Sequence, residues 1–513
     1  MKKRILLILC VIAALSLAAC QKQEAPKENA QNEGNQNKTE QAEKMDAPIV
    51  IGQTWVVGNT EPTDSSVPWS LTSHGVSETV FMLDEKGKLF SRFIDSFERV
   101  DDLTWKAITK NEAKFSNGDL ADANAIADAM NTIQKNNPLS NATAGMVNFT
   151  ATDDKTLEIK TERPLQRLDS FLTEWSNIVF KDLGNGEYAY TGPYQIQELN
   201  KGIELKLVPN PQYPDADKRT DVKVMAFKDT SALNLAFEAG EVDMAFTVTP
   251  EIAAMLKDAG KNVKTIDAGY QYFGIFNLKS DVLKEFDVRE AINLGINRDE
   301  YIKALQGGKV ATGFFANYYD YAGDSIVKND VEAAKKLLDD IGWKLNVNGV
   351  REREGKTLDI KLVTYPSRPD LSVIMQIMAS QLKEIGFNVT TEVVDGIDKV
   401  GQSGEFDLIL YAQHTAPTDD PSFALNQFFR TGQGKNHAGY SSEKMDGILD
   451  KLGAEQDPAK RVELAKEAQA QIFTDLPVLY LVDPQWHIAV SERLANYQPY
   501  CGDYYIVNSQ LMK

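Results

Sequence analysis

Cysteine is nearly absent from this chain, which has three cysteines among its 513 residues. Cys10 falls in an N-terminal apolar stretch that we expect to be removed, and Cys20 ends a candidate lipid-attachment motif. Cys501 would then stand alone, which excludes an internal disulfide. A single thiol outside any reactive motif is typical of a buried, inert side chain rather than a nucleophile.

The motifs of common enzyme classes are also missing. The chain has no G-x-x-x-x-G-K-S/T phosphate loop, no H-E-x-x-H metal motif, no C-x-x-C pair and no G-x-S-x-G nucleophile turn. It has four histidines, and their spacing singles out no Ser-His-Asp set: His74, His414, His437 and His487. We therefore expect that the protein is not an enzyme, with a surface hydrolase as the weaker alternative.

Positive charge is in short supply, since 55 Lys and Arg residues face 74 Asp and Glu residues and the net charge is −19. Such an excess of negative charge repels phosphate backbones and anionic headgroups, so we expect no nucleic acid as a partner. A second long apolar run is missing as well. No membrane span is therefore expected beyond the N-terminal segment.

The N-terminus has the organisation of an export signal. Basic residues 2–4 precede the apolar run 5–17, and small residues lead to Cys20. Residues 1–19 are predicted to be a signal peptide and Cys20 a lipidated N-terminus, with an ordinary secretory signal as the alternative. Residues 20–46 are polar and predict a disordered tether. The expected location is extracytoplasmic, lipid-anchored to the cell membrane, on its outer face or periplasmic side.

The remaining residues alternate between strand and helix patterns, which indicates an α/β fold with more than one domain. The clearest unit is strand 358–364, helix 371–385 and strand 387–394, with Gly386 ending the helix. This order predicts a parallel strand pair with a right-handed crossover. Residues 406–412 would add a third strand, and 147–160 read as a hairpin. The sequence thus predicts two α/β lobes and an additional mixed segment.

Polar and titratable side chains gather after the strand predicted at 406–412. Pro417 and Pro421 break the strand, and residues 422–430 favour a short helix between two polar loops. In open α/β sheets, ligands bind beyond the carboxyl ends of strands. We therefore expect ligand contacts in the stretch 406–440.

Several short motifs together resemble one family of binding proteins. They are TGPY at 191–194, NPQY at 210–213, VREAIN at 288–293 with Asn297-Arg298, QLKEIG at 381–386 and NHAGYS at 436–441. In these motifs, and over essentially all of residues 47–513, the chain resembles the family 5 solute-binding proteins of ABC importers, the peptide/nickel class.

The resemblance implies a two-lobed periplasmic-binding-protein fold of class II type, with an extra domain on the N-terminal lobe. The N-terminal lobe would comprise residues 47–75, 188–275 and 480–513. The additional domain would comprise residues 76–187 and the C-terminal lobe residues 276–479. The resemblance also implies a monomer that encloses a small solute by hinge closure and delivers it to an ABC permease and its ATPase. No resident cofactor is implied, because a metal ion would be part of the transported ligand.

Two branches of the family remain open for the ligand. Peptide binders hold the peptide ammonium with an acid at the place of Pro417, for which Asp419 is the nearest substitute. The nickel branch has a histidine in the following loop, and His437 matches it as a metal contact. The candidate ligand-binding residues are Trp69, His74, Tyr272, Arg368, His414, Asp419, Asp420, His437 and Tyr440. We expect nickel, a nickel–chelator complex or a short peptide as the ligand, with a signalling receptor as a weaker alternative role.

Overall fold

The computed structural model describes residues 47–84, 88–326, 328–417 and 420–512. The predicted signal peptide, the Cys20 lipidation site, the tether and Asp419 lie outside the described residues. Ala47–Lys513 forms one compact unit. Within the described part of the chain, no helix has both the length and the apolar character that a membrane crossing requires.

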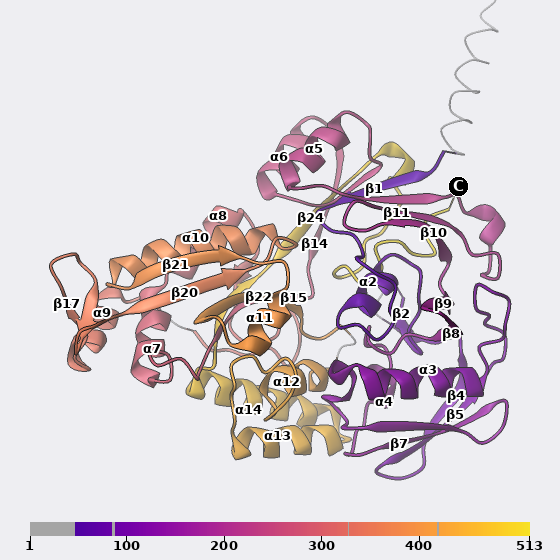
Figure 1. Cartoon of the computed structure of the whole chain (residues 1–513), viewed down its shortest axis with the longest axis horizontal. Helices are drawn as coiled ribbons and strands as arrows, with labels where there is room; N and C mark the ends of the chain where they lie inside the picture. The colour runs from indigo at the N-terminus through magenta and orange to yellow at the C-terminus, as the bar shows by residue number, and fades with distance from the viewer. Residues whose placement is uncertain (1–46, 85–87, 327, 418–419, 513) are drawn as a thin grey trace, which may run out of the picture. The chain divides into compact units, whose positions relative to one another are not determined.

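The first lobe is built on a seven-stranded sheet of the described residues (Figure 1). Its order is β10 (Tyr194–Asn200), β11 (Glu204–Pro209), β12 (Val222–Ala226), β1 (Ile49–Gln53), β13 (Met244–Val248), β24 (Gln485–Val490) and β14 (Asn262–Asp267). β1 pairs in parallel with β12, with Ile49 opposite Val222. The helices α5 (Thr230–Glu238) and α6 (Pro250–Asp258) bury Leu233, Ala253 and Leu256 against Ala245 of β13.

The second lobe is built on a six-stranded sheet. Its order is β16 (Lys309–Val310), β23 (Val478–Asp483), β15 (Tyr270–Phe276), β22 (Leu408–His414), β20 (Asp359–Thr364) and β21 (Asn388–Val393). β20 is parallel to both β21 and β22, which confirms the predicted parallel unit and its third strand. The crossover is α10 (Pro369–Glu384), as predicted from the apolar spacing of residues 371–385.

Helices cover both faces of this second sheet. Leu362 of β20 and Leu410 of β22 pack in one apolar cluster with α10, whereas Val363 and Ile409 pack with the C-terminal helices. Alternate strand residues point to opposite faces, so both faces must be apolar, and the central strands β15, β22 and β23 are buried throughout. The C-terminal helices are α12 (Ser422–Phe429), α13 (Glu443–Ala454) and α14 (Pro458–Asp475), visible below the sheet in Figure 1.

The chain passes between the two sheets at two places. β14 of the first sheet is followed directly by β15 of the second, and β23 of the second by β24 of the first. The residues between these strands are Ala268 and Gly269 at one crossing and Pro484 at the other. The resemblance to family 5 solute-binding proteins implies two lobes joined by two crossover segments, as found here. The lobe limits 275 and 480 stay predictions, and the sheet pairing favours limits near 269 and 484.

A smaller mixed segment follows β1 in the chain. It contains a four-stranded sheet in the order β4 (Ile94–Arg99), β5 (Thr104–Thr109), β7 (Thr156–Thr161) and β6 (Val147–Ala151), next to α3 (Ala123–Asn136). β6 and β7 are the predicted hairpin, and they bury alternate residues such as Phe149 and Ile159. Two hairpins complete the segment, β2 (Met82–Leu83) with β3 (Leu89–Phe90) and β8 (Phe180–Gly184) with β9 (Glu187–Tyr190).

The other elements are short. They are the helices α2 (Val67–Ser73), α4 (Leu168–Phe171), α7 (Phe286–Gly295), α8 (Arg298–Leu305), α9 (Val331–Asp340) and α11 (Ile397–Ser403), the 3-10 turns η1 (Pro138–Asn141), η2 (Ala216–Lys218) and η3 (Glu492–Leu494), and the strands β17 (Lys344–Leu345), β18 (Arg351–Arg353) and β19 (Lys356–Thr357). A capping side chain three residues before a Glu predicts helix starts at Asp287 and Asn297, and Asp330 predicts another. Asn297 and Asp330 cap α8 and α9 with their side chains, as predicted. The predicted cap at Asp287 is wrong, because α7 already begins at Phe286 and places Asp287 inside its first turn.

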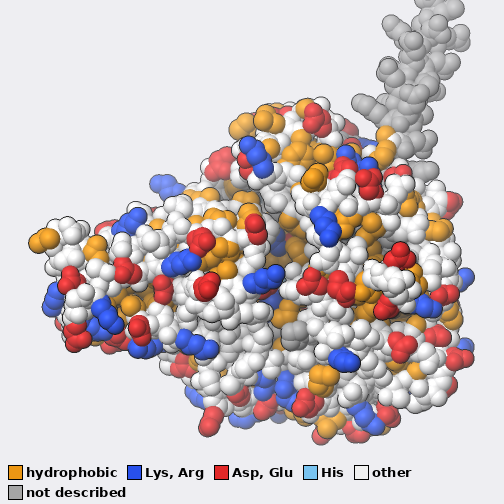
Figure 2. All heavy atoms as spheres, viewed as in Figure 1, with side chains coloured by type: hydrophobic (Ala, Val, Ile, Leu, Met, Phe, Trp, Pro, Cys, Tyr) orange, Lys and Arg blue, Asp and Glu red, His pale blue; other side chains and the backbone are white. Residues whose placement is uncertain are grey.

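The visible surface mixes charges of both signs. Figure 2 shows Asp and Glu side chains interspersed with Lys and Arg side chains over both lobes. No continuous basic surface is seen on this face.

Candidate functional site

The candidate site is a cavity of about 250 Å³ to which both lobes contribute side chains. It is lined by Ser65, Ser66, Trp69, Trp175, Tyr270, Tyr365, Ser367, Arg368, Asp395, Gly396, Ile397, Asp398, Lys399, Tyr411, Ala412, Gln413, Lys435 and Tyr504. Many of these residues stand at or just after the carboxyl ends of β20, β21 and β22. Such strand ends are where open α/β sheets bind ligands.

A buried ion pair joins the two lobes beside this cavity. Arg368, at the start of α10, donates from Nη2 to Asp503 Oδ2 over 2.6 Å, and Asp503 has no exposed surface. Burial by itself would lower the pKa of Arg368, but the charge of Asp503 raises this pKa above its usual range. The positive charge of Arg368 is therefore matched within the protein.

Aromatic side chains surround the same ion pair. Tyr270 and Trp69 donate from their OH and Nε1 atoms to Asp503 Oδ1 over 2.5 and 3.2 Å. The Arg368 guanidinium lies over the rings of Tyr270, Trp486 and Trp69, at 4.9, 5.2 and 5.8 Å from the ring centroids. Arginine stacked in this way combines an ion pair with cation–π attraction.

A second carboxylate, Asp398, lies in the cavity wall. Its Oδ1 atom accepts hydrogen bonds from the Tyr411 OH at 2.9 Å and from His437 Nε2 at 3.2 Å. Burial would raise the pKa of Asp398, but the His437 hydrogen bond and the Lys435 charge outweigh it and lower the pKa to about 2. Asp398 is therefore ionised at neutral pH.

A buried cation, Lys435, lies in the same cavity wall. Its Nζ donates to Gln413 Oε1 over 3.1 Å and lies 5.7 Å from the ring centroids of both Trp175 and Tyr411. Burial lowers the pKa of Lys435, and the charges of Asp398 and Glu174 oppose this shift. The ammonium has three donors, of which one is used by a protein oxygen among the described residues.

Two further polar groups near the cavity lack partners. The Tyr504 OH and both carboxyl oxygens of Glu174 are buried without a hydrogen bond among the described residues. Burial raises the pKa of Glu174 well above its ordinary value. A ligand in the cavity could supply the hydrogen bonds that these polar atoms lack.

Of the candidates predicted from the sequence, Trp69 and Arg368 line this cavity. His437 lies behind Asp398 and lines a separate outer groove of about 560 Å³ with Asn277 and Gly401. His414 lies outside the lining and bonds through Nε2 to the Cys501 carbonyl oxygen at 2.9 Å. Their roles as ligand contacts stay predictions.

The remaining described candidates are engaged by other protein groups. Asp420 Oδ2 accepts from Arg461 at 2.5 Å, and the Tyr440 OH donates to Asp475 at the same distance. The Tyr272 OH donates to Asp370 over 2.9 Å. His74 is fully buried against Gln53, with its Nε2 atom 2.9 Å from Gln53 Nε2. None of these side chains lines the described cavity.

Sequence reasoning missed most of the cavity wall, including Tyr270, Tyr365, Asp398, Lys435 and Tyr504. His414 was a candidate because ligands bind beyond the carboxyl ends of strands. The same rule applies to Tyr365 and Asp398, because these residues follow β20 and β21. Lys435 directly precedes the NHAGYS motif. Trp175 and Tyr504 carried no such signal, since they come from distant parts of the chain.

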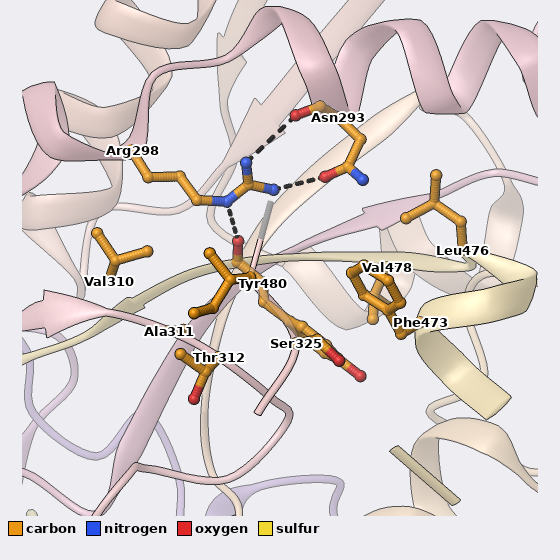
Figure 3. Close-up of a pocket in the computed structure, with 11 residues that line it drawn as sticks. Asn293, Arg298, Val310, Ala311, Thr312, Ser325, Phe473, Leu476, Val478 and Tyr480 are labelled. Atoms are coloured by element: carbon orange, nitrogen blue, oxygen red, sulfur yellow. Dashed lines mark hydrogen bonds between the residues drawn. The ribbon is translucent and has the colours of Figure 1, made fainter. Parts of the chain in front are cut away.

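A second, mostly apolar pocket is drawn in Figure 3. Arg298 points into it and donates to the Tyr480 carbonyl at 2.6 Å, to the Asn293 carbonyl at 3.2 Å and to Asn293 Oδ1 at 2.7 Å. These bonds fix the α7–α8 corner on β23 and satisfy the guanidinium. The motif residues Asn293 and Arg298 therefore serve the fold.

A resident metal ion has no evident site in this structure. Among the described residues, no group of three or more His, Cys, Asp or Glu side chains is placed to hold one. His437 has one neighbouring carboxylate, Asp398, and that carboxylate faces the cavity.

Comparison with known proteins agrees with the fold. Residues 88–436 match the family model described as bacterial extracellular solute-binding proteins, family 5, middle. The chain belongs to this family. The two-lobed fold with its interlobe cavity is therefore that of a solute-binding protein.

Individual relatives differ in what they bind. The nickel-binding protein NikA of Staphylococcus aureus is 23% identical over 85% of this chain and 88% of its own length. Its crystal structure with Ni(L-His)2 has a TM-score of 0.81 and covers 90% of this chain and 98% of that one, at 22% identity. The oligopeptide-binding protein AppA of Bacillus subtilis, solved with a nonapeptide, has a TM-score of 0.76 at 19% identity and covers 87% and 95%.

Proposed function

We propose that this chain is the extracytoplasmic substrate-binding lipoprotein of an ABC importer and that it captures a small solute by hinge closure. The observation that carries the proposal is the 250 Å³ cavity, whose wall combines aromatic rings with Lys435 and Asp398 and draws on both lobes. A ligand that contacts both lobes binds the closed form best and so shifts the population towards it. Binding and delivery, rather than catalysis, are the role of the protein.

The size of the cavity favours a compact ligand. Pockets for drug-sized molecules measure roughly 300–1,000 Å³. At about 250 Å³, this cavity matches a single amino-acid complex or a very short peptide better than an extended oligopeptide. A nonapeptide, as in the AppA structure, would need a larger space.

A nickel–chelator complex is the ligand we favour. The described residues offer no three-ligand cluster for a bare ion, so the metal would arrive with its own chelator. The relative NikA was crystallised with such a complex, Ni(L-His)2. In this proposal the chain recognises the chelator by hydrogen bonds and aromatic contacts.

A short peptide is the second candidate. Asp398 supports it, because a buried carboxylate in the wall suits the terminal ammonium of a peptide. This carboxylate lies in the first turn of α11, whereas the sequence suggested Asp419, in the polar stretch predicted after residues 406–412, as the nearest acid.

Native mass spectrometry of the freshly purified full chain tests the proposal. We expect a bound species of a few hundred daltons, with nickel in its isotope pattern if a chelate is bound. Calorimetry with Ni(L-His)2, nickel chloride and a dipeptide then ranks the ligands, and we expect nickel chloride to bind most weakly. A chain that carries no solute and binds none of these probes would refute the proposal.

A further inference from the structure

The cavity contains two opposite charges that do not pair with each other. Asp398 and Lys435 both line it, yet no ion pair joins them among the described residues. Each instead has a supporting group behind it, His437 for Asp398 and Gln413 for Lys435. Two buried charges held apart in this way are costly unless a ligand completes their hydrogen bonds.

The carboxylate of Asp398 leaves one oxygen free for a ligand. Tyr411 and His437 both donate to Oδ1 of Asp398, and Oδ2 has no hydrogen bond to any described residue. The Asp398 side chain is 23% exposed, whereas His437 behind it is 1% exposed. The free oxygen is therefore the accessible one, and it suits an N–H donor.

The ammonium group of Lys435 leaves hydrogen-bond donors free for a ligand. Lys435 is 6% exposed and gives one hydrogen bond to Gln413 among the described residues, so two N–H groups are unused. The rings of Trp175 and Tyr411 border the ammonium, and both rings also line the cavity. These donors suit a carboxylate.

The other charges of the cavity cancel. Arg368 is matched by Asp503. Asp395 and Lys399 lie at the exposed rim and are also of opposite sign. A strongly anionic or cationic ligand would therefore meet no compensating net charge.

We propose that the cavity recognises a net-neutral compound with an amino-acid head group, whose nitrogen donates to Asp398 and whose carboxylate accepts from Lys435. This inference rests on the proposed function and specifies its ligand class. The nitrogen is either a free ammonium or an amine bound to a metal, since both present N–H donors. The shared chemistry thus covers a zwitterionic amino acid or dipeptide and a neutral amino-acid chelate.

Calorimetry on the full chain with blocked and unblocked probes tests the assignment. The probes are L-histidine, N-acetyl-L-histidine, L-histidinamide, Ala-Phe, its acetylated and amidated forms, and Ni(L-His)2. We expect blocking either end to weaken binding by about 10- to 100-fold, the effect of one hydrogen bond to a charged group. If Ni(L-His)2 binds more tightly than L-histidine and Ala-Phe, the natural ligand is an amino-acid chelate. If L-histidine or Ala-Phe binds more tightly, the natural ligand is a zwitterion.

Variants of Asp398 and Lys435 test which end of the ligand each side chain binds. Asp398→Asn should abolish the preference for a free amine and keep the preference for a free carboxylate, and Lys435→Met should do the opposite. Lys435→Arg keeps the charge and should retain carboxylate preference. Glu405→Gln and Lys444→Gln remove exposed charges of the same sign elsewhere and should change neither preference. Melting temperatures of all variants confirm that they are folded.

The outcomes separate the subsite from the general function. If the parent chain binds a probe but Asp398→Asn and Lys435→Met keep the preferences for a free amine and a free carboxylate, the roles assigned to Asp398 and Lys435 are wrong and the binding function stands. If the parent binds none of these probes, the ligand class is wrong. The proposed function fails as well only if native mass spectrometry also finds no bound solute.

Discussion

His437 Nε2 lies 3.2 Å from Asp398 Oδ1, on the side of the carboxylate that faces away from the cavity. The histidine singled out by the sequence therefore contacts a cavity-lining aspartate that the sequence did not single out. A hydrogen bond from His437 fixes the orientation of Asp398, much as outer groups orient metal-bound side chains.

Removal of His437 should weaken ligand binding indirectly. His437→Ala frees Asp398 to rotate, and we expect affinity to fall by about tenfold, the lower end of the effect of losing such a supporting group. His437→Gln can still donate to Asp398 and should recover most of the affinity. Calorimetry with L-histidine and Ni(L-His)2 measures both variants.

The two probes discriminate between indirect and direct roles for His437. A positioning role predicts equal losses for both probes. A loss confined to Ni(L-His)2 would instead show that the imidazole contacts the metal. His487→Gln, a change on β24 outside the cavity, is the control.

The Arg368–Asp503 pair should hold the lobes together before ligand arrives. Asp503→Asn leaves a buried guanidinium unpaired, and breaking a buried ion pair costs about 3–5 kcal/mol. We expect a lower unfolding midpoint in urea and a larger radius of gyration for the ligand-free protein by small-angle scattering. The double variant Arg368→Met with Asp503→Asn removes both charges and should recover part of the stability. An unchanged radius in Asp503→Asn would count against the interlobe role.

Ligand binding should make the protein more compact. A solute that contacts both lobes stabilises the closed form, so saturation with ligand should lower the radius of gyration. The effect should be larger in Asp503→Asn than in the parent chain, because the variant starts more open. Equal radii with and without ligand in both proteins would argue against closure.

Acid should destabilise the protein through two buried histidines. Burial lowers the pKa of His74 to about 3 and that of His414 to about 4. The unfolded chain has histidine pKa values near ~6.5, so below this pH it binds more protons than the folded chain. Stability is then fully present above pH ~6.5 and falls as the pH drops towards the folded values, by up to about 1.4 kcal/mol per pH unit for each group.

Urea unfolding of His74→Gln and His414→Gln between pH 7 and pH 4.5 measures these contributions. Each variant should lose stability less steeply with acid than the parent chain. Subtracting the stability curve of the parent chain from that of each variant removes the contributions of titrating groups that both proteins share. One such group is Asp483, whose pKa burial raises to about 6 and whose effect on stability has the opposite sign. Parallel curves for parent and variants would contradict the assignment.

Cys20→Ser should release the protein from the membrane fraction. The expectation follows from the signal-like residues 1–19 and from the small residues that lead to Cys20. Fractionation of cells that express the parent and the variant checks it, with circular dichroism as the folding control. A variant that stays with the membrane would show that the anchor is elsewhere.

The fold was largely predictable because its signals are local. The apolar spacing along α10 and the side-chain caps Asn297 and Asp330 lie within the elements that they define. Even so, the cap predicted at Asp287 failed, since an acidic residue suits the first turn of a helix as well as its cap.

The site was less predictable because its contacts are long-range. Asp420 was a candidate by its loop, but Arg461, 41 residues later, uses its carboxylate. His414 similarly meets a carbonyl 87 residues away. A sequence shows which side chains can bind a ligand, and only the packing decides which of them remain free to do so.

The two crossings between the sheets have unequal freedom. Gly269 has no side chain, and a Cβ there would lie 2.3 Å from the His414 ring, so no other residue fits. Pro484, at the other crossing, has its φ angle fixed near about −65°. If the lobes close on a solute as proposed, a glycine joint beside a proline joint would restrict their rotation to few axes, so that each closure would follow nearly the same path.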